Sequence, residues 1–147
     1  MKQEETVDFH LRWTWHKIAR MYNSQADMLG GSMSMGFILL NIDKDGSPST
    51  SLGPKMGMES RSLTRILRAM EDLGLVIRVH GEEDRRNVFI HLTEKGRKMR
   101  NTSRATVLKY NKYLQDNISP KKLETFFEVI GMINEMTEPD LVYPPKK

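Results

Sequence analysis

The sequence contains no cysteine. This absence excludes disulfide bonds, thiolate nucleophiles and cysteine-ligated metals. Long hydrophobic runs are also missing: the apolar stretch at residues 37–40 is only a few residues long, whereas a helix that crosses a bilayer needs about 20. The first residues are acidic and mixed, without the basic start and apolar stretch of a secretory signal. We therefore expect a cytoplasmic protein with no contact to a membrane.

The common motifs of catalysis and metal binding are missing as well. We find no Gly-x-Gly-x-x-Gly, phosphate loop, His-Glu-x-x-His or Gly-x-Ser-x-Gly. Residues 43–46 (Asp-Lys-Asp-Gly) are weakly similar to a calcium loop, but Pro54 occupies the position that requires a bidentate glutamate. The four histidines show no ligand spacing with carboxylates. We predict that the protein is not an enzyme and has no metal and no cofactor.

Positive charge is concentrated in the middle of the chain. The 147 residues, 38% of them hydrophobic and 29% charged, are typical of one globular domain with a net charge of +4. Residues 55–100 hold eleven Lys/Arg against seven Asp/Glu, so this third alone carries +4. Residues 1–54 carry −1 and residues 101–147 carry +1. A local basic excess on a neutral background indicates a nucleic-acid surface.

Hydrophobic spacing predicts a mainly α fold with a small β-hairpin. Apolar residues follow the helical period over four segments, and the period then changes to two, as in strands. The turn residues at 43–48 separate the second and third helices. The expected helices are 7–29, one capped by Ser32 or Ser34 that ends near residue 42, 50–56, 60–73, 93–118 and one that starts at 119–120; the expected strands are 75–80 and 88–92.

The helix at residues 60–73 is amphipathic, with one apolar and one basic arc. Every amphipathic helix needs a polar face, so the basic arc could be only a solvated surface. However, no acid lies four residues before Arg65 or Arg68, and a guanidinium bonds guanine or phosphate well. Ser60 and Ser62 at the helix start suit phosphate contacts. The apolar arc holds Leu63, Ile66, Leu67, Met70 and Leu73, and the basic arc holds Arg61, Thr64, Arg65, Arg68 and Asp72.

Three segments around the expected hairpin carry a family signature. They are residues 74–78 (Gly-Leu-Val-Ile-Arg), 83–86 (Glu-Asp-Arg-Arg) and 92–96 (Leu-Thr-Glu-Lys-Gly). By themselves, the charges at the hairpin tip could simply decorate a loop. Together the segments resemble the wing of the MarR family of winged-helix transcriptional regulators, and Leu63-Thr64-Arg65 is similar to its recognition helix. The sequence departs from the family pattern at residues 51–57, where glycine and proline predict a shorter or bent helix.

The resemblance implies a winged helix-turn-helix, residues 33–96, flanked by N- and C-terminal dimerisation helices. These helices cover residues 5–30 and 94–136 of a single domain, and residues 137–147 are an expected flexible tail. Arg86 would enter the minor groove, oriented by a salt bridge from Asp84, since a narrow minor groove attracts guanidinium groups. The implied DNA-binding residues are Ser60, Arg61, Ser62, Thr64, Arg65, Arg68, Asp84, Arg85 and Arg86.

The first and last helices have more apolar surface than one small domain needs. Packing within the chain could account for it, but the family resemblance implies a homodimer. The expected interface residues are Phe9, Leu11, Trp15, Phe126, Phe127, Ile130 and Ile133. The family also binds small aromatic or phenolic effectors, for which Trp13, His16, Met33, Met35 and Phe37 could line a crevice. For each of these five residues taken singly, plain core is the favoured interpretation, because methionine and aromatics at helical spacing usually are core.

The sequence therefore predicts a sequence-specific regulator of transcription that binds double-stranded DNA. We expect a repressor that acts as a homodimer on a pseudo-palindromic operator and is released by a small aromatic effector. The alternative is a winged-helix protein-interaction module without sequence-specific DNA binding. The arginines of the helix and hairpin favour the DNA-binding interpretation. Peroxide sensing through a thiol, which some members of the family use, is excluded because cysteine is absent.

Overall fold

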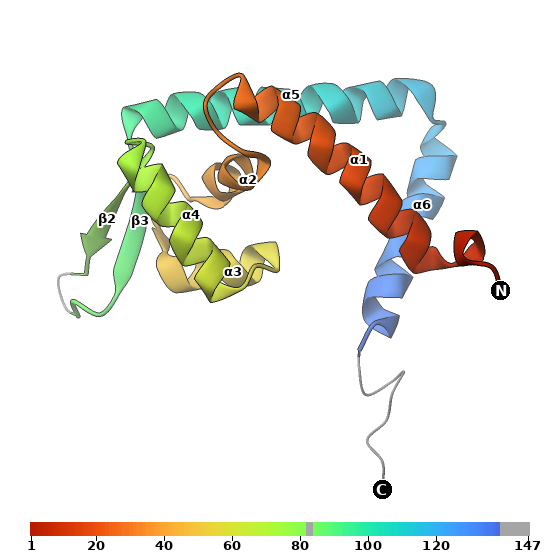
Figure 1. Ribbon diagram of the computed structural model, residues 1–147, viewed down its shortest axis with the longest axis horizontal. Coiled ribbons are helices and arrows are strands. Elements are labelled where there is room, and N and C mark those ends of the chain that lie inside the picture. The colour runs from red at the N-terminus through yellow and green to blue at the C-terminus, as the bar shows by residue number, and fades with distance from the viewer. Residues whose placement is uncertain (82–83, 139–147) are drawn as a thin grey trace, which may run out of the picture. The chain divides into compact units, whose positions relative to one another are not determined.

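A computed structural model of the chain describes residues 1–81 and 84–138. Most of the tail expected at residues 137–147, and part of the expected hairpin tip, lie outside the described residues. The chain forms two compact units, residues 1–106 and residues 107–147. In chain order, the elements are η1 (Gln3–Glu5), α1 (Val7–Asp27), α2 (Met33–Asn41), β1 (Ser47–Pro48), α3 (Ser49–Met56), α4 (Ser60–Asp72), β2 (Val76–His80), β3 (Val88–Leu92), α5 (Glu94–Asn117) and α6 (Pro120–Met136) (Figure 1).

The core of the first unit lies between α2, α3, α4 and the sheet. Ser32 caps α2, since its hydroxyl accepts a hydrogen bond from the Met35 amide at 3.3 Å. Of the apolar arc of α4, Leu63, Leu67 and Met70 are buried as the sequence predicts. Ile66 is half-buried against the core, and Leu73, which follows the helix end, is 38% exposed. The fully packed residues are Ile38, Leu39, Ile42, Leu52, Leu63, Leu67, Met70, Leu75, Val76 and Ile90.

Helix α3 is not shortened by its internal proline, contrary to our expectation. Pro54 lies near the C-terminal end and is exposed, and the helix still spans eight residues. The Met58 amide donates to the Gly53 carbonyl at 2.9 Å and the Gly57 amide to the Pro54 carbonyl at 3.3 Å. Gly57 has φ +59°, the left-handed conformation that this pattern of C-terminal bonds requires. The glycines and the proline therefore make a tight turn into α4.

The sheet has three strands in the order β1-β3-β2, one more than the sequence predicts. The prediction of a turn over residues 43–48 is wrong for the last two residues, because Ser47 pairs with Ile90 and Pro48 with Phe89 in the sheet. Ser47 is fully buried, and its hydroxyl accepts from the Asp43 amide at 2.9 Å and donates to the Asp43 carboxylate at 2.8 Å. These bonds hold the turn so that a two-residue strand can form after it.

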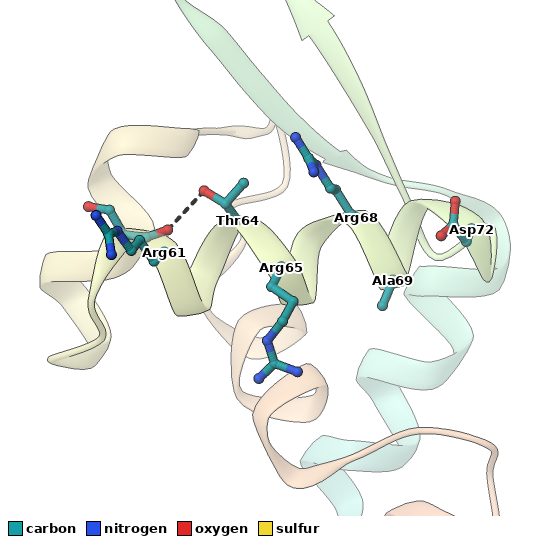
Figure 2. A pocket seen from close by; sticks show the side chains of 7 residues that line it. Arg61, Thr64, Arg65, Arg68, Ala69 and Asp72 are labelled. Atoms are coloured by element: carbon teal, nitrogen blue, oxygen red, sulfur yellow. Dashed lines mark hydrogen bonds between the residues drawn. The ribbon is translucent and has the colours of Figure 1, made fainter.

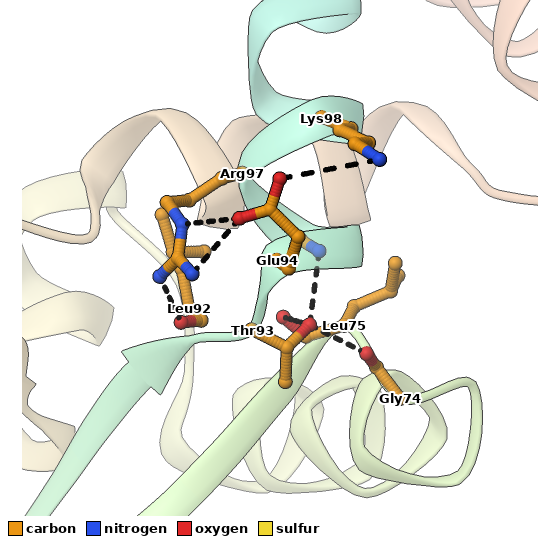
Figure 3. A network of polar contacts seen from close by, with 8 residues as sticks. Gly74, Leu75, Leu92, Thr93, Glu94, Arg97 and Lys98 are labelled. Atoms are coloured by element: carbon orange, nitrogen blue, oxygen red, sulfur yellow. Dashed lines mark hydrogen bonds and ion pairs between the residues drawn. The ribbon is translucent and has the colours of Figure 1, made fainter.

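A network of polar contacts joins the start of α5 to the turn between α4 and β2 (Figure 3). The Thr93 hydroxyl donates to the Gly74 carbonyl at 2.6 Å and accepts from the Gly96 amide at 3.0 Å, so Thr93 also caps α5. The Thr93 amide donates to the Leu75 carbonyl at 3.1 Å. Gly96 is buried, and a Cβ atom there would collide with the Leu75 carbonyl oxygen. The Leu-Thr-x-x-Gly segment is thus the joint between hairpin and helix.

Helix α1 packs on α2 through only part of its surface. The Phe37 ring contacts Trp15 at 6.3 Å and Tyr22 at 6.2 Å between centroids, and Asn23 accepts from the Met33 amide at 2.9 Å. No residue of α1 is buried. No helix within residues 1–81 and 84–138 is long and apolar enough to cross a membrane.

The second unit has no buried residue among its described residues, 107–138. It consists of the C-terminal part of α5 and the whole of α6. Helix α6 begins at Pro120, with Ser119 at its N-cap position. Large apolar side chains of α6 are exposed, including Phe127 at 65%. This unit therefore has apolar surface but no core of its own.

The Gly96 joint gives a test of the fold. We expect Gly96→Ala to lower the free energy of unfolding by about 3 kcal/mol, because the added methyl group displaces the Leu75 backbone. The measurement is urea denaturation followed by circular dichroism. Gly36→Ala is the matched control, since its methyl group meets only the Ser103 side chain, at 3.3 Å, and should change the stability by less than about 1 kcal/mol. Equal effects of the two changes would contradict the role of Gly96.

Candidate nucleic-acid interface

The outward face of α4 forms a shallow open hollow lined by that helix alone (Figure 2). Arg61, Arg65 and Arg68 are exposed along it, as the sequence predicts. Burial of the opposite face against the core holds this face outward, because the two arcs belong to one rigid helix. The lining residues are Ser60, Arg61, Thr64, Arg65, Arg68, Ala69 and Asp72.

The three guanidinium groups of this face have no protein partner in the described part of the chain. The side chains of Arg61, Arg65 and Arg68 take part in no ion pair or hydrogen bond there. Asp72, four residues after Arg68, does not pair with it. Fifteen hydrogen-bond donors therefore face solvent, since each guanidinium carries five. Such a surface can bind a polyanion without first breaking internal bonds.

The three hydroxyl-bearing residues of α4 differ in their availability. Ser60 is exposed at the helix start, where the free backbone amides suit an anion. Ser62 is half-buried, at the margin of the exposed face. Thr64 is exposed, but its hydroxyl donates to the Ser60 carbonyl at 2.8 Å. Ser60 is therefore better placed than Ser62 for a phosphate contact.

The hairpin presents two more arginines at its tip. Arg85 and Arg86 are exposed, and the hairpin runs back from the end of α4 in the direction of the start of that helix (Figure 1). The Asp84 carboxylate accepts a hydrogen bond from the Arg86 amide at 2.9 Å, whereas the resemblance implies a salt bridge to the Arg86 side chain. His80 Nδ1 donates to the Arg85 carbonyl at 2.9 Å. Asp84 and His80 thus position the backbone of the tip and leave the guanidinium groups extended.

A contact that sequence reasoning missed ties the hairpin to α4. Arg78 Nε donates to Glu71 Oε2 at 2.7 Å, and each side chain is 31% exposed. Arg78 Nη2 is buried without a hydrogen-bond partner in the described part of the molecule. Arg78 belongs to the Gly-Leu-x-x-Arg segment, but its partner lies on the preceding helix, across the turn at Gly74. An acid seven residues before that arginine is the signal that could have identified the pair.

Of the residues expected to line an effector crevice, Trp13 does not lie beside Phe37. Trp13 stacks on Phe9 at 6.2 Å with the Lys17 ammonium group 5.8 Å from its ring, and it is 58% exposed. Trp15, two positions further along α1, is the residue that contacts Phe37. Because residues two apart point to different sides of a helix, Trp13 faces away from Phe37. His16 is exposed, and Met33 and Met35 are half-buried on α2.

The residues expected at a dimer interface keep apolar surface on both units. On α1, Leu11 and Trp15 are exposed and Phe9 is half-buried. On α6, Phe126 and Phe127 are exposed and in contact with each other at 5.6 Å, while Ile130 and Ile133 are half-buried. The structure therefore leaves these side chains open to a further partner.

The pKa of one carboxylate outside this face is shifted by its local contacts. Hydrogen bonds from Ser47 and Lys55, together with the charge of Lys55, hold the pKa of Asp43 below its usual value. This carboxylate serves the turn before β1. No group of three or more His, Asp or Glu side chains could hold a metal ion in residues 1–81 and 84–138.

Comparison with known proteins matches this chain to transcriptional regulators, both by a family model and by a relative. Residues 32–88 match the sequence model of the MarR family. The HTH-type transcriptional regulator YfiV of Bacillus subtilis (strain 168) is 30% identical over 109 residues, which cover 73% of this chain and 68% of that protein. The matched family segment contains α2, α3 and α4 and extends to the start of β3.

Solved structures show the same fold at low sequence identity. MepR of S. aureus, in a complex with DNA, has a TM-score of 0.82 at 16% identity and covers 88% of this chain and 97% of that chain. CouR from Rhodococcus jostii RHA1, bound to p-coumaroyl-CoA, has a TM-score of 0.74 at 18% identity and covers 100% of this chain and 99% of that chain. These similarities confirm the predicted fold class, mainly α with a small β wing.

The different surroundings of two arginines give a test of the site geometry. We expect Arg65→Ala to change the free energy of unfolding by less than about 0.5 kcal/mol, because its guanidinium group has no partner. Arg78→Ala should lower it by about 1–2 kcal/mol, since it leaves the half-buried Glu71 carboxylate unpaired. Thermal unfolding and urea titration measure both changes. A large loss of stability in Arg65→Ala would show that this face serves the fold.

Proposed function

Because this chain belongs to the MarR family of transcriptional regulators, we propose that it regulates transcription by binding double-stranded DNA in a sequence-specific manner. We further propose that it is a repressor, acts as a homodimer and recognises a pseudo-palindromic operator. The single observation that carries the proposal is the row of exposed arginines on α4, which form no ion pair with residues 1–81 or 84–138. Arginines that merely stabilised the helix surface would have acidic partners.

Each part of the interface suits a different groove of DNA. An α-helix fits the major groove, where an arginine fork can bond the O6 and N7 atoms of guanine. The hairpin tip, with Arg85 and Arg86, suits the minor groove, whose negative potential attracts guanidinium groups. Ser60 and Ser62 would contact phosphates, and Asp84 would hold the Arg86 backbone. The proposed DNA-binding set is therefore Ser60, Arg61, Ser62, Thr64, Arg65, Arg68, Asp84, Arg85 and Arg86.

A homodimer follows from the apolar surface of the second unit. No residue of its described part is buried, so its apolar side chains gain a core only from a partner. A second copy of the chain offers the same surface, as a two-fold interface requires. We place Phe126, Phe127, Ile130 and Ile133 in this interface with Phe9, Leu11 and Trp15. Two copies would then meet successive major grooves about 34 Å apart.

We also propose that a small aromatic molecule releases the operator. CouR was solved with p-coumaroyl-CoA, a ligand with an aromatic group. In this chain, Met33, Met35 and Phe37 on α2 supply adaptable apolar surface beside α1. Trp13 faces away from Phe37 and His16 is exposed on α1, so both would join this site only if the effector or the partner copy reached them.

The remaining parts of the proposal concern organisation and location. The family consists of transcriptional regulators, and we infer that this member has no catalytic activity and acts in the cytoplasm, where a bacterial chromosome lies. Residues 33–96 would form the DNA-binding part, and residues 5–30 and 94–136 the dimerisation part. The alternative, a winged helix that binds only proteins, is less favoured because Arg61, Arg65 and Arg68 form no ion pair within the described residues.

Binding to duplex DNA tests the proposal directly. We expect Arg61→Ala and Arg86→Ala each to weaken binding to nonspecific duplex DNA on the order of tenfold at moderate salt. Each change should also reduce the slope of log affinity against log salt concentration by about 2 for a dimer, because one phosphate-neutralising charge is lost per copy. Fluorescence anisotropy over a salt series measures both quantities.

The control for this experiment is Arg104→Ala. Arg104 is exposed on α5 and lies outside the proposed interface, so its loss should leave the salt slope unchanged. If neither Arg61→Ala nor Arg86→Ala altered binding more than Arg104→Ala did, the proposed DNA interface would be wrong.

The oligomeric state tests the second part of the proposal. We expect the purified protein to have twice the 17.1 kDa mass of one chain in light scattering. Phe127→Glu should shift it towards the monomer, because a charge then replaces a 65% exposed apolar side chain of the interface. Lys121→Glu, a change at an exposed position of the same helix, should leave the dimer intact. A stable monomer in the unchanged protein would refute the dimer.

A further inference from the structure

Thr64 is an uncharged residue on the basic face of α4 that carries both a hydroxyl and a methyl group. It is exposed, with Arg61 three residues before it and Arg68 four residues after it, so the three side chains lie on neighbouring turns. The arginines can bond phosphates or guanine. Thr64 has no guanidinium group for such contacts. The contact that it can make with a ligand depends on whether its hydroxyl or its methyl group faces outward.

The hydroxyl of Thr64 is already engaged by its own helix. It donates to the Ser60 carbonyl at 2.8 Å. A threonine hydroxyl has a single hydrogen, and a phosphate offers only acceptor oxygens, so a phosphate contact would first have to break this bond. The same hydrogen is also unavailable for an acceptor on a base edge. Donation to DNA by Thr64 is therefore disfavoured.

The hydrogen bond also fixes the direction of the methyl group. Because the oxygen is turned towards the backbone of the preceding turn, the methyl group points away from the helix, as Figure 2 shows for the labelled side chain. An apolar group is thus held rigidly between two arginines on the surface that is proposed to enter the major groove. Its orientation is set before any ligand binds.

The major groove offers one apolar group, the 5-methyl group of thymine. We propose that the Thr64 methyl group contacts the 5-methyl group of one thymine in each half-site and so determines specificity at that position. This inference rests on the proposed function and names the base that the helix selects. It also gives the operator a chemical requirement: a thymine beside the positions that the neighbouring arginines contact.

The experiment uses the full chain and a DNA duplex selected by its affinity for the protein. The highest-affinity duplex is selected from a randomised pool, and each of its thymines is then replaced in turn by deoxyuridine, which pairs identically but lacks the methyl group. Dissociation constants are measured for the unchanged protein, for Thr64→Ser and for Thr64→Val. Serine keeps the hydroxyl without the methyl group, and valine keeps a methyl group without the hydroxyl.

We expect one thymine per half-site at which deoxyuridine weakens binding by about fourfold, the effect of one buried methyl group, and on the order of tenfold when both half-sites are changed. Thr64→Val should show the same sensitivity. Thr64→Ser should bind the thymine duplex as weakly as the unchanged protein binds the duplex with deoxyuridine in both half-sites, because a homodimer loses the methyl group in each copy. It should bind that doubly changed duplex no more weakly than it binds the thymine duplex. Circular dichroism should show the same helix content in all three proteins.

Two results would overturn the inference while leaving the proposed function intact. One is salt-dependent duplex binding with no thymine sensitive to loss of its methyl group. The other is full thymine sensitivity in Thr64→Ser, which would assign the contact to another apolar group such as Ala69. If instead the pool contained no duplex that the protein retained in a salt-dependent way, the proposed function itself would fail.

Discussion

The close approach of two backbone segments at Gly96 and Leu75 is the constraint on which the rest of the first unit depends. Only a residue without a side chain fits there, since a Cβ atom at Gly96 would collide with the Leu75 carbonyl oxygen. The Thr93 hydroxyl bonds both the Gly74 carbonyl and the Gly96 amide, so one side chain ends the hairpin and begins α5. Because Gly74 also ends the α4 segment, these bonds hold the helix, the hairpin and α5 at a single joint.

Helix α4 divides stability and recognition between its two faces. Its apolar residues contribute to the core, and its arginines contribute no internal contact in the described part of the chain. The Glu71–Arg78 pair adds a second link between this helix and the hairpin. The joint at Gly96 and the Glu71–Arg78 pair thus connect the hairpin to α4 through residues outside the exposed basic face.

The second unit shows the opposite balance, with helices but no core among its described residues. Its stability is then coupled to association, since the apolar side chains of α6 are removed from water only when a partner covers them. For a regulator that binds a two-fold DNA site, this coupling means that the second unit is stable in the dimer, which has one copy of the chain for each half-site.

Local patterns in the sequence predicted the six α-helices to within two or three residues and both long strands, because apolar periodicity and capping residues act over a few neighbours; they did not predict the short 3-10 helix η1. They also predicted the exposed basic face of α4, since the apolar arc of one rigid helix determines where the opposite arc points. The motif at residues 92–96 was identified from sequence, but its physical role was not.

Contacts between distant segments were decided only by the tertiary structure. The β1 strand forms because Ser47 and Pro48 lie beside β3, which is more than forty residues away in sequence, so a local turn pattern could not reveal it. The Glu71–Arg78 pair depends on the angle between α4 and β2. The side of α1 that packs on α2 carries Trp15, so Trp15 and not Trp13 contacts Phe37. The sequence by itself determined which surfaces are apolar or basic. The packing determined which distant residues are in contact, because a contact requires both residues to be positioned by the same core.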